Sequence, residues 1–384
     1  MQNFSTILNQ ILDLIPRSEF NRHVKQFSGD KYVKHFTAFN LLTVLLMAQA
    51  KGQDSQRHVV STFSYHKKKW AHLGIKHIAR STIADANNRL DHRVFETLFY
   101  TLVSKCQSVS KTRQFSFKNP VFAMDASVID LCLSVFDWAK FRKRKGAIKL
   151  HSLYDLQRGI PTVSVITEGK DHECKVAKDP LFMPCPDSII VFDRGYNDFT
   201  QFQQYTNKGV WFVTRAKKNI AYTITGQLDK NSKEGVYFDD TIEVNSDGYA
   251  GLLRLIGYFD ETTQKVFQFL TNNFSLTALQ IAEIYKSRWE VELFFKWIKQ
   301  NLKVKTFLGT SKNAVYSQIW VSLCYLLILT FIRHQTQFKR SLLTLSRLIK
   351  EAFFERVSFL DILSLKPPDV PFVSGNLRQL SLNL

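Results

Sequence analysis

Cysteine is scarce in this chain and follows no pairing pattern. The five cysteines are an odd number, and no two of them lie two or three positions apart. Neither a zinc site with closely spaced cysteines nor a disulfide framework is therefore indicated. The sequence also shows no basic start followed by an apolar run and a small-residue cleavage site. We expect a cytoplasmic protein with reduced thiols.

Long apolar runs are missing as well. The longest, Ile319–Ile332, contains Ser322 and Thr330 and is shorter than the ~20 residues that cross a bilayer. Because 45% of the 384 residues are apolar and 32 are Phe, the chain can bury a sizeable core. This composition excludes disordered and collagen-like proteins. We interpret Ile319–Ile332 as a core helix and expect no membrane partner.

Acidic residues are too few to balance the basic ones. Asp and Glu number 33 against 52 Lys and Arg, so the formal charge is 52 − 33 = +19. Such an excess is typical of proteins that bind nucleic acid or an anionic membrane surface. Each basic cluster alone fits a solvated surface, but their sum, with no lipidation motif, favours nucleic acid. The clusters are Lys67–Lys69, Arg142–Lys145, Arg215–Lys218 and Lys296–Lys305.

The front of the chain is predicted to be all-helical. Apolar residues recur at helical spacing up to about residue 106, with breaks only near Gly29, Gly52 and Gly74. We assign residues 1–65 to an N-terminal helical domain and 66–118 to a helical DNA-binding or linker region. Within the latter, residues 78–90 have Ser81 as a candidate N-cap and fit either a helix that enters a DNA groove or ordinary packing.

The remainder is predicted to be of the α/β class. An α/β core is expected over 119–218 and 274–335, interrupted by a β-rich insertion at 219–273 and followed by a C-terminal helical tail at 336–384. A turn is expected at Gln157–Gly159. The strands predicted for the core are Val121–Ala126, Ala147–Tyr154, Ile160–Thr167, Ser188–Phe192 and Val210–Thr214.

Two aspartates directly follow apolar strands. Asp125 follows Val121–Met124 and Asp193 follows Ile189–Phe192, where an unpaired charge is costly. Either residue alone also fits an Asp that starts a turn or caps a helix. After Asp193 the sequence continues as Arg194-Gly195-Tyr196, in which Gly195 permits a sharp turn and Arg194 places a cation beside the carboxylate.

A third carboxylate lies on a predicted helix around residues 285–299. At 100° per residue, Tyr285, Arg288, Glu292 and Lys299 fall within one sixty-degree stripe, which Lys296 extends. The stripe also fits a solvated row of i,i+4 pairs, worth ~0.2–0.5 kcal/mol each. Apolar side chains cover most of the remaining helix surface, and this favours a buried helix whose polar stripe faces a cleft.

Three carboxylates that meet in a fold have a chemical reason to do so. They repel one another and are stable as anions around a divalent metal. Oxygen ligands favour magnesium or manganese. Two such ions can activate an attacking water or 3′-hydroxyl and stabilise the leaving oxygen of a phosphodiester. Asp125, Asp193 and Glu292 are thus candidate catalytic and metal-binding residues, with nearby Asp130 as a rival to Asp125.

These residues resemble the DDE transposases of bacterial insertion sequences, specifically the insertion-sequence-4 group. That group carries Tyr, two residues, Arg, three residues, Glu, six residues, Lys, and this sequence has Tyr285, Arg288, Glu292 and Lys299 at that spacing. Its two aspartates match Asp125 and Asp193. The resemblance implies a ribonuclease-H-like mixed sheet with helices, interrupted by a β-rich insertion and preceded by a helical region. It also implies two magnesium ions, replaceable by manganese, on the three acids.

The resemblance further implies the partner and the reaction. The partner is double-stranded DNA, both the element's terminal inverted repeats and the target. The reaction is strand cleavage at the element's ends and strand transfer of the 3′-hydroxyl, by a homodimer on DNA. A DNA-binding relic without activity and a nuclease that cuts without joining remain alternatives. The candidate DNA-binding residues are Tyr285, Arg288, Lys299, Trp289, Arg194, Lys296 and Arg215.

Overall fold

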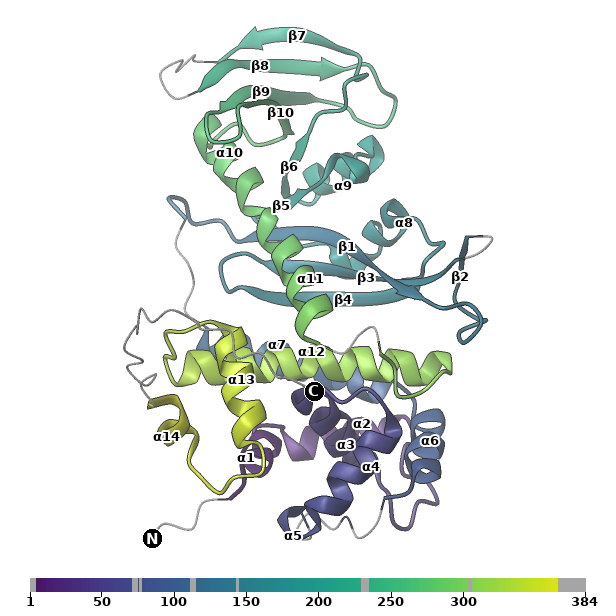
Figure 1. Cartoon of the computed structure of the whole chain (residues 1–384). Helices are drawn as coiled ribbons and strands as arrows, with labels where there is room; N and C mark the ends of the chain where they lie inside the picture. The colour runs from purple at the N-terminus through teal and green to yellow at the C-terminus, as the bar shows by residue number, and fades with distance from the viewer. Residues whose placement is uncertain are drawn as a thin grey trace, which may run out of the picture.

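The computed structural model arranges the chain in three tiers (Figure 1). A helical layer forms one end, a mixed sheet the middle, and the β-rich insertion the other end. The structure describes residues 5–364 except 71–74, 76–77, 111–114, 143–144, 229–234 and 303–305. Parts of two basic clusters and the last twenty residues of the predicted tail lie outside the described residues.

The helical layer joins the two ends of the chain. Helix α12 packs against α7 and α3, and α13 packs against α12 and α3, so residues from both ends share one hydrophobic core. The division of this layer into separate domains stays a prediction. The helices are α1 (Ile7–Asp13), α2 (Arg17–Gln26), α3 (Ala38–Lys51), α4 (Gln56–Tyr65), α5 (Lys67–Trp70), α6 (Arg80–Arg89), α7 (Arg93–Val109), α12 (Lys312–Gln335), α13 (Leu342–Ala352) and α14 (Phe359–Ser364).

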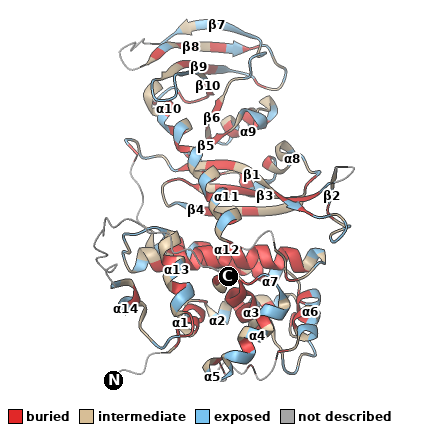
Figure 2. Cartoon of the chain, in the orientation of Figure 1, coloured by how far each residue is buried: buried red, intermediate tan, exposed pale blue. Residues whose placement is uncertain are grey.

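Helix α12 contains the longest apolar run of the sequence. It is the one helix among the described residues that is long and apolar enough to cross a membrane, yet 94% of its most apolar window is buried inside the protein. Figure 2 shows it as buried over most of its length. The expected core helix is confirmed, because its apolar surface is covered by other helices.

The predicted cap of the helix near residue 80 is wrong. Helix α6 begins at Arg80, with Ala79 at the N-cap position and no side-chain hydrogen bond to the first turn. Ser81 therefore lies inside the helix. Ile83 and Ala86 are buried, while Arg80, Asn88 and Arg89 are exposed, so one face of the helix is used for packing.

The mixed sheet has a ribonuclease-H-like strand arrangement. Strand β1 pairs antiparallel with β3 and parallel with β5, β5 pairs parallel with β6, and β4 pairs with the outer side of β3. The turn predicted at Gln157–Gly159 joins β3 to β4, and Gly159 adopts the left-handed φ of 68° there. The strands are β1 (Val121–Leu131), β2 (Lys140–Arg142), β3 (Lys145–Asp155), β4 (Ile160–Glu168), β5 (Ile189–Phe192) and β6 (Trp211–Arg215).

The β-rich insertion continues this sheet and does not form a sheet of its own. Strand β10 pairs antiparallel with β6, and the order then runs through β9 and β8 to β7 at the edge. The insertion therefore extends the hydrogen-bond ladder of the core. Its strands are β7 (Tyr222–Gln227), β8 (Val236–Val244), β9 (Leu252–Asp260) and β10 (Lys265–Thr271).

The predicted helix around residues 285–299 is divided into two segments. Helix α10 spans Ala278–Ser287 and α11 spans Trp289–Asn301. Arg288 between them keeps helical dihedrals, with φ −51° and ψ −29°, so the side-chain spacing across the junction stays helical. Helix α11 packs against β1, and α10 and α11 together run from the insertion to the helical layer (Figure 1). Two shorter helices, α8 (Glu173–Ala177) and α9 (Phe199–Asn207), flank β5 in the sequence.

Candidate active site

Asp125 and Asp193 emerge side by side from neighbouring strands. The parallel pairing of β1 with β5 ends at Met124 opposite Phe192, and each aspartate is the next residue in its chain. The prediction that Asp125 ends its strand is wrong, because β1 continues to Leu131 through its pairing with β3. Asp130 is five positions further along the strand, so the alternation of side chains directs it to the opposite face.

Burial dominates the electrostatics of Asp125. Its side chain is 20% exposed, and desolvation raises the pKa of the carboxyl to about 6. The backbone N–H of Ala126, which donates to this carboxylate at 2.8 Å, and the Arg288 guanidinium oppose the increase in pKa. Glu292 and Glu173 reinforce it by repulsion. Asp125 is thus a carboxylate with too little positive charge around it.

The turn after Asp193 is a short 3-10 helix, Arg194–Tyr196, which Asp193 caps by accepting from the Arg194 N–H. Gly195 does not have a positive φ, so the turn does not require glycine for its backbone conformation. A Cβ at Gly195 would meet no atom within 4 Å. The glycine therefore leaves open space beside the aspartate. Arg194 is exposed, as expected for a cation available to a ligand.

Arg288 connects two of the three carboxylates. Its guanidinium donates to Glu292 at 2.6 Å and lies 4.0 Å from the Asp125 carboxylate. It also lies over the Tyr285 ring, 5.5 Å from the centroid. The pKa of the Tyr285 hydroxyl is raised, mainly by burial. Arg288 opposes this increase, and the negative charge of Asp193 adds to it. The predicted stripe is thus assembled next to both aspartates.

A cleft of about 490 Å³ opens beside this assembly. Asp125 and Glu292 lie on its walls together with Lys296 and Lys299. Two acids and two predicted phosphate-binding cations therefore share one hollow, in which an anionic ligand would lie beside the acids.

A larger pocket of about 940 Å³ lies between the β9–β10 hairpin and helices α10 and α11. Four of the predicted DNA-binding residues line it: Tyr285, Arg288, Trp289 and Arg215. Trp289 is 57% exposed, and the Arg215 guanidinium lies 5.2 Å from the centroid of the Phe267 ring. Flat aromatic and cationic side chains of this kind suit a nucleobase with its phosphate.

Two residues near the acids were missed by the sequence interpretation. Glu173, at the start of α8, repels both Asp125 and the Tyr196 hydroxyl, and it pairs with Lys149 at 3.4 Å. Tyr196 is 5% exposed, and its hydroxyl has no hydrogen-bond partner among the described residues. Burial raises the pKa of Tyr196, and repulsion by Asp125 and Glu173 adds to the increase. No spacing rule identifies Glu173, because only the fold brings α8 to the sheet.

The donor chemistry of the site fits a hard divalent cation. Carboxylate oxygens are the ligands that magnesium and manganese prefer, and the raised pKa of Asp125 shows a need for more positive charge. In the part of the chain that the structure describes, however, no three His, Cys, Asp or Glu side chains lie close enough together to hold a metal ion. Arg288 supplies the charge between Asp125 and Glu292 instead.

The comparison with known protein families is decisive. Residues 116–328 match the model of the Transposase DDE domain family, which is more than half of the chain. The chain belongs to the DDE transposase family. Members of this family are nuclease-like DNA-processing enzymes that generally use divalent metal. Residues 3–76 match a second model, described only as a domain of unknown function (DUF4372).

A curated relative extends the similarity over most of this transposase. The chain is 24% identical over 340 residues to the "Probable transposase for insertion sequence element IS5377" of Geobacillus stearothermophilus, covering 88% of this chain and 87% of that protein. An insertion-sequence transposase is therefore supported. Among solved structures, the piggyBac transposase synaptic complex with hairpin DNA covers 85% of this chain and 75% of its own, at 10% identity and a TM-score of 0.45. This value is too low to establish a shared fold.

Proposed function

We propose that this chain is a transposase of the insertion-sequence-4 group that cleaves DNA at the ends of its element and joins the freed 3′-hydroxyl to target DNA. The observation that carries the proposal is the meeting of Arg288 with both Asp125 and Glu292, next to Asp193. Tyr285 and Lys299 complete the spaced Tyr, Arg, Glu, Lys pattern. These residues come from separate parts of the chain, and the fold brings them to one edge of the sheet.

Asp125, Asp193 and Glu292 would hold two magnesium ions, which manganese can replace. When bound, these ions supply Lewis-acid activation of a water or 3′-hydroxyl and stabilise the leaving oxygen of the phosphodiester. The buried carboxylate of Asp125 gains most from added positive charge, because desolvation already disfavours its anionic form.

The cations would position the DNA backbone. Arg288 presents a planar guanidinium, suited to two oxygens of one phosphate, and its Nε has no hydrogen-bond partner among the described residues. Lys296 and Lys299 line the cleft beside the acids and can neutralise a second phosphate. Trp289 and Tyr285 line the larger pocket and offer aromatic faces to a base. Arg215 and Arg194 would add charge at the rim.

The partners follow from the same proposal. The substrate is double-stranded DNA, first the terminal inverted repeats and then the target. Two subunits would bridge two ends, as the resemblance implies. We place the enzyme in the bacterial cytoplasm, on the nucleoid when it is bound to DNA, where the five free cysteines stay reduced.

Nicking of a supercoiled plasmid that carries the element's ends tests the proposal. We expect nicks at the element's ends only with magnesium or manganese. Asp193→Asn should abolish them, because this amide cannot supply the same charge to a hard cation, while end binding without metal persists. Undiminished cleavage by Asp193→Asn would refute the assignment.

The two alternatives give different results in the same assay. A DNA-binding relic shifts end DNA on a gel and leaves it uncut with every divalent ion. A nuclease without joining activity cuts the ends and yields no strand-transfer product. Joined products recovered from the wild type and absent from Asp193→Asn exclude both.

A further inference from the structure

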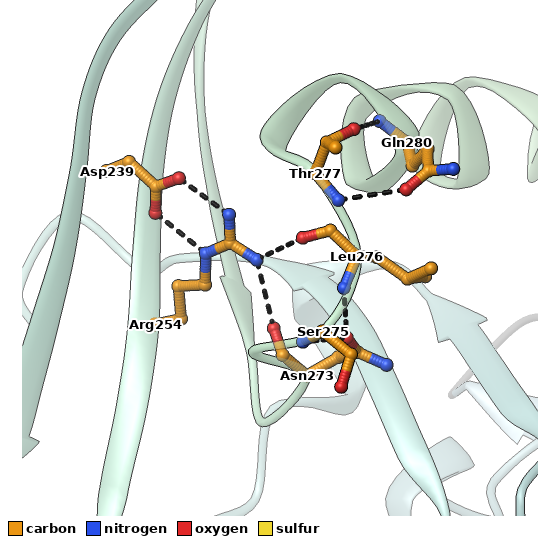
Figure 3. Close-up of polar contacts among 7 residues, drawn as sticks. All are labelled: Asp239, Arg254, Asn273, Ser275, Leu276, Thr277 and Gln280. Carbon is orange, nitrogen blue, oxygen red and sulfur yellow. Dashed lines mark hydrogen bonds and ion pairs between the residues drawn. The ribbon is translucent and has the colours of Figure 1, made fainter. Parts of the chain in front are cut away.

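A buried ion pair lies within the β-rich insertion (Figure 3). Arg254 on β9 donates through Nε to one oxygen of Asp239 on β8 at 2.7 Å, and through Nη2 to the other at 2.6 Å. The two side chains are 5% and 4% exposed. A buried pair of this kind contributes little net stability compared with apolar side chains of similar volume, so its presence calls for another explanation.

The third nitrogen of the guanidinium bonds to the chain beyond the strands of the insertion. Arg254 Nη1 donates to the backbone carbonyls of Asn273, at 3.2 Å, and Leu276, at 2.5 Å. Both carbonyls belong to the turn that joins β10 to α10. Lysine could not reproduce these contacts, because its ammonium has three donors on one atom, whereas Arg254 makes four bonds from three nitrogens.

The turn that receives these bonds determines where α10 begins. The Asn273 side chain accepts from the N–H groups of Ser275 and Leu276, both at 2.9 Å. Thr277 follows directly and forms a capping box with Gln280, through bonds of 2.9 and 3.2 Å. Figure 3 shows that the bonds of Arg254 and the Thr277–Gln280 cap lie next to each other on one stretch of the chain. The start of α10 is thus fixed to the insertion through Arg254.

This attachment connects the elements that form the two walls of the larger pocket, although its own residues do not line the pocket. One wall is the β9–β10 hairpin, to which Arg254 belongs. The other is formed by α10 and α11, which carry Tyr285, Arg288 and Trp289. The ion pair therefore links the strand wall to the first residues of the helix wall, and its bonds limit how far the walls can separate.

We propose that Asp239 and Arg254 are positioning residues of the transposase, which hold the DNA-binding pocket at its working width by fixing the start of α10 to the insertion. This inference rests on the proposed function for its consequence in catalysis. Neither residue touches the reacting atoms. Their effect passes through the helix that carries Tyr285, Arg288 and Glu292.

The width of the pocket can be measured without DNA or metal. Val266→Cys on β10 and Glu283→Cys on α10 place nitroxide labels on opposite walls of the full-length chain, after Cys132, Cys174 and Cys185 are replaced by Ser. We expect one narrow distance distribution in this parent. The variant Asp239→Leu/Arg254→Met replaces the ion pair by apolar side chains that fill the same space. Its distribution should broaden or shift, because the turn carbonyls lose their donor.

Two variants make the measurement specific. Asp91→Leu/Arg93→Met removes an ion pair of the same residue types that is more exposed and lies in the helical layer, and it should leave the distribution unchanged. Arg254→Lys keeps the charge and loses the planar fork, so it should broaden the distribution even if the double variant fails to fold. An unchanged distribution in cooperatively folding Arg254→Lys, or in the folded double variant, would overturn the inference.

The rate of DNA nicking then tests whether the width of the pocket matters for catalysis. At saturating DNA we expect the double variant to nick about 10- to 100-fold more slowly per folded molecule, because small misplacements of positioning groups are costly in rate. End-DNA affinity should change less than the rate. If the parent itself does not nick, the proposed function fails while the distance result stands. A widened pocket with an unchanged nicking rate would reject the role in catalysis.

Discussion

Arg288 places its guanidinium next to two acids, Glu292 and Asp125, that repel each other. It lies 2.6 Å from Glu292 and 4.0 Å from Asp125, and only 12% of its side chain is exposed. At these distances the attraction between unit charges is about 4 kcal/mol or more at an effective dielectric constant of about 20. The guanidinium therefore stabilises the acids before any metal or DNA arrives.

Arg288→Gln separates this stabilising role from DNA binding. Without the cation, Asp125 and Glu292 repel each other more strongly, so a divalent ion should bind more tightly to the DNA-free protein. Calorimetric titration with manganese should show a lower Kd than in the wild type, while plasmid nicking falls. An equal or weaker affinity for manganese would show that Arg288 does not compete with the metal.

His151 on β3 makes the fold sensitive to acid. Its side chain is 2% exposed, and burial, aided by Lys149, lowers its pKa to about 4. In the unfolded chain the pKa is about 6.5, so between these values the unfolded state binds more protons and stability falls as pH falls. From pH 7 to pH 5 this histidine should cost about 2 kcal/mol of unfolding free energy.

The variant His151→Gln isolates this effect. Glutamine can still bond to the Thr167 hydroxyl, which lies 2.9 Å from His151 Nε2, but does not titrate. Denaturant unfolding at pH 7 and pH 5 should show a smaller loss of stability for the variant than for the wild type. Equal losses for the two proteins would contradict the prediction.

At the scale of elements, helix ends determine how the layer is built. Gly52 ends α3 in the left-handed conformation, with φ 69°, and its N–H donates to the carbonyls of Ala48 and Gln49. A side chain in this conformation costs about 1–2 kcal/mol. The twelve buried residues of α3 are thus followed by a stop that only glycine makes without strain.

We expect Gly52→Ala to lower the midpoint of thermal unfolding. Gly195→Ala is the matched control, because its backbone does not have a positive φ and the new Cβ meets no atom within 4 Å. The control should unfold at the wild-type temperature. A loss of the same size in both variants would show that the conformation at Gly52 is not the cause.

For the whole molecule, the charge of +19 governs DNA binding. The stretch from Ser55 to Ala84 contains no Asp or Glu, and exposed Lys67 and Lys68 lie on α5 within it. Each phosphate neutralised by a lysine adds about 0.9 to the slope of log affinity against log salt. Residues 66–84 of this acid-free stretch, which include both lysines, belong to the region that the sequence assigns to DNA binding or to a linker.

Replacing Lys67 and Lys68 by Gln should lower that slope by about 2 if both contact phosphates. Fluorescence anisotropy of labelled end DNA over a salt series measures it. Lys31→Gln/Lys34→Gln, in the exposed turn between α2 and α3, is the control and should keep the wild-type slope. An unchanged slope in Lys67→Gln/Lys68→Gln would assign the region to the linker role.

The sequence alone determined those features of the protein that depend on a local pattern of residues. The longest apolar run identified α12 as a core helix, and short runs of β-forming residues identified the core strands, because segments that are buried in a core are rich in apolar residues. Apolar runs ending in Asp marked Asp125 and Asp193, and helical spacing placed Arg288 beside Glu292.

Only the tertiary structure decided what depends on distant contacts. Strand pairing carried β1 beyond Asp125 and joined the insertion to the core sheet. The approach of α8 brought Glu173 near Asp125, and the turn before α10 turned a buried Arg254 into a link between two walls. These outcomes depend on which surfaces meet after folding. Residues that are far apart in the chain form no local sequence pattern from which such contacts could be predicted.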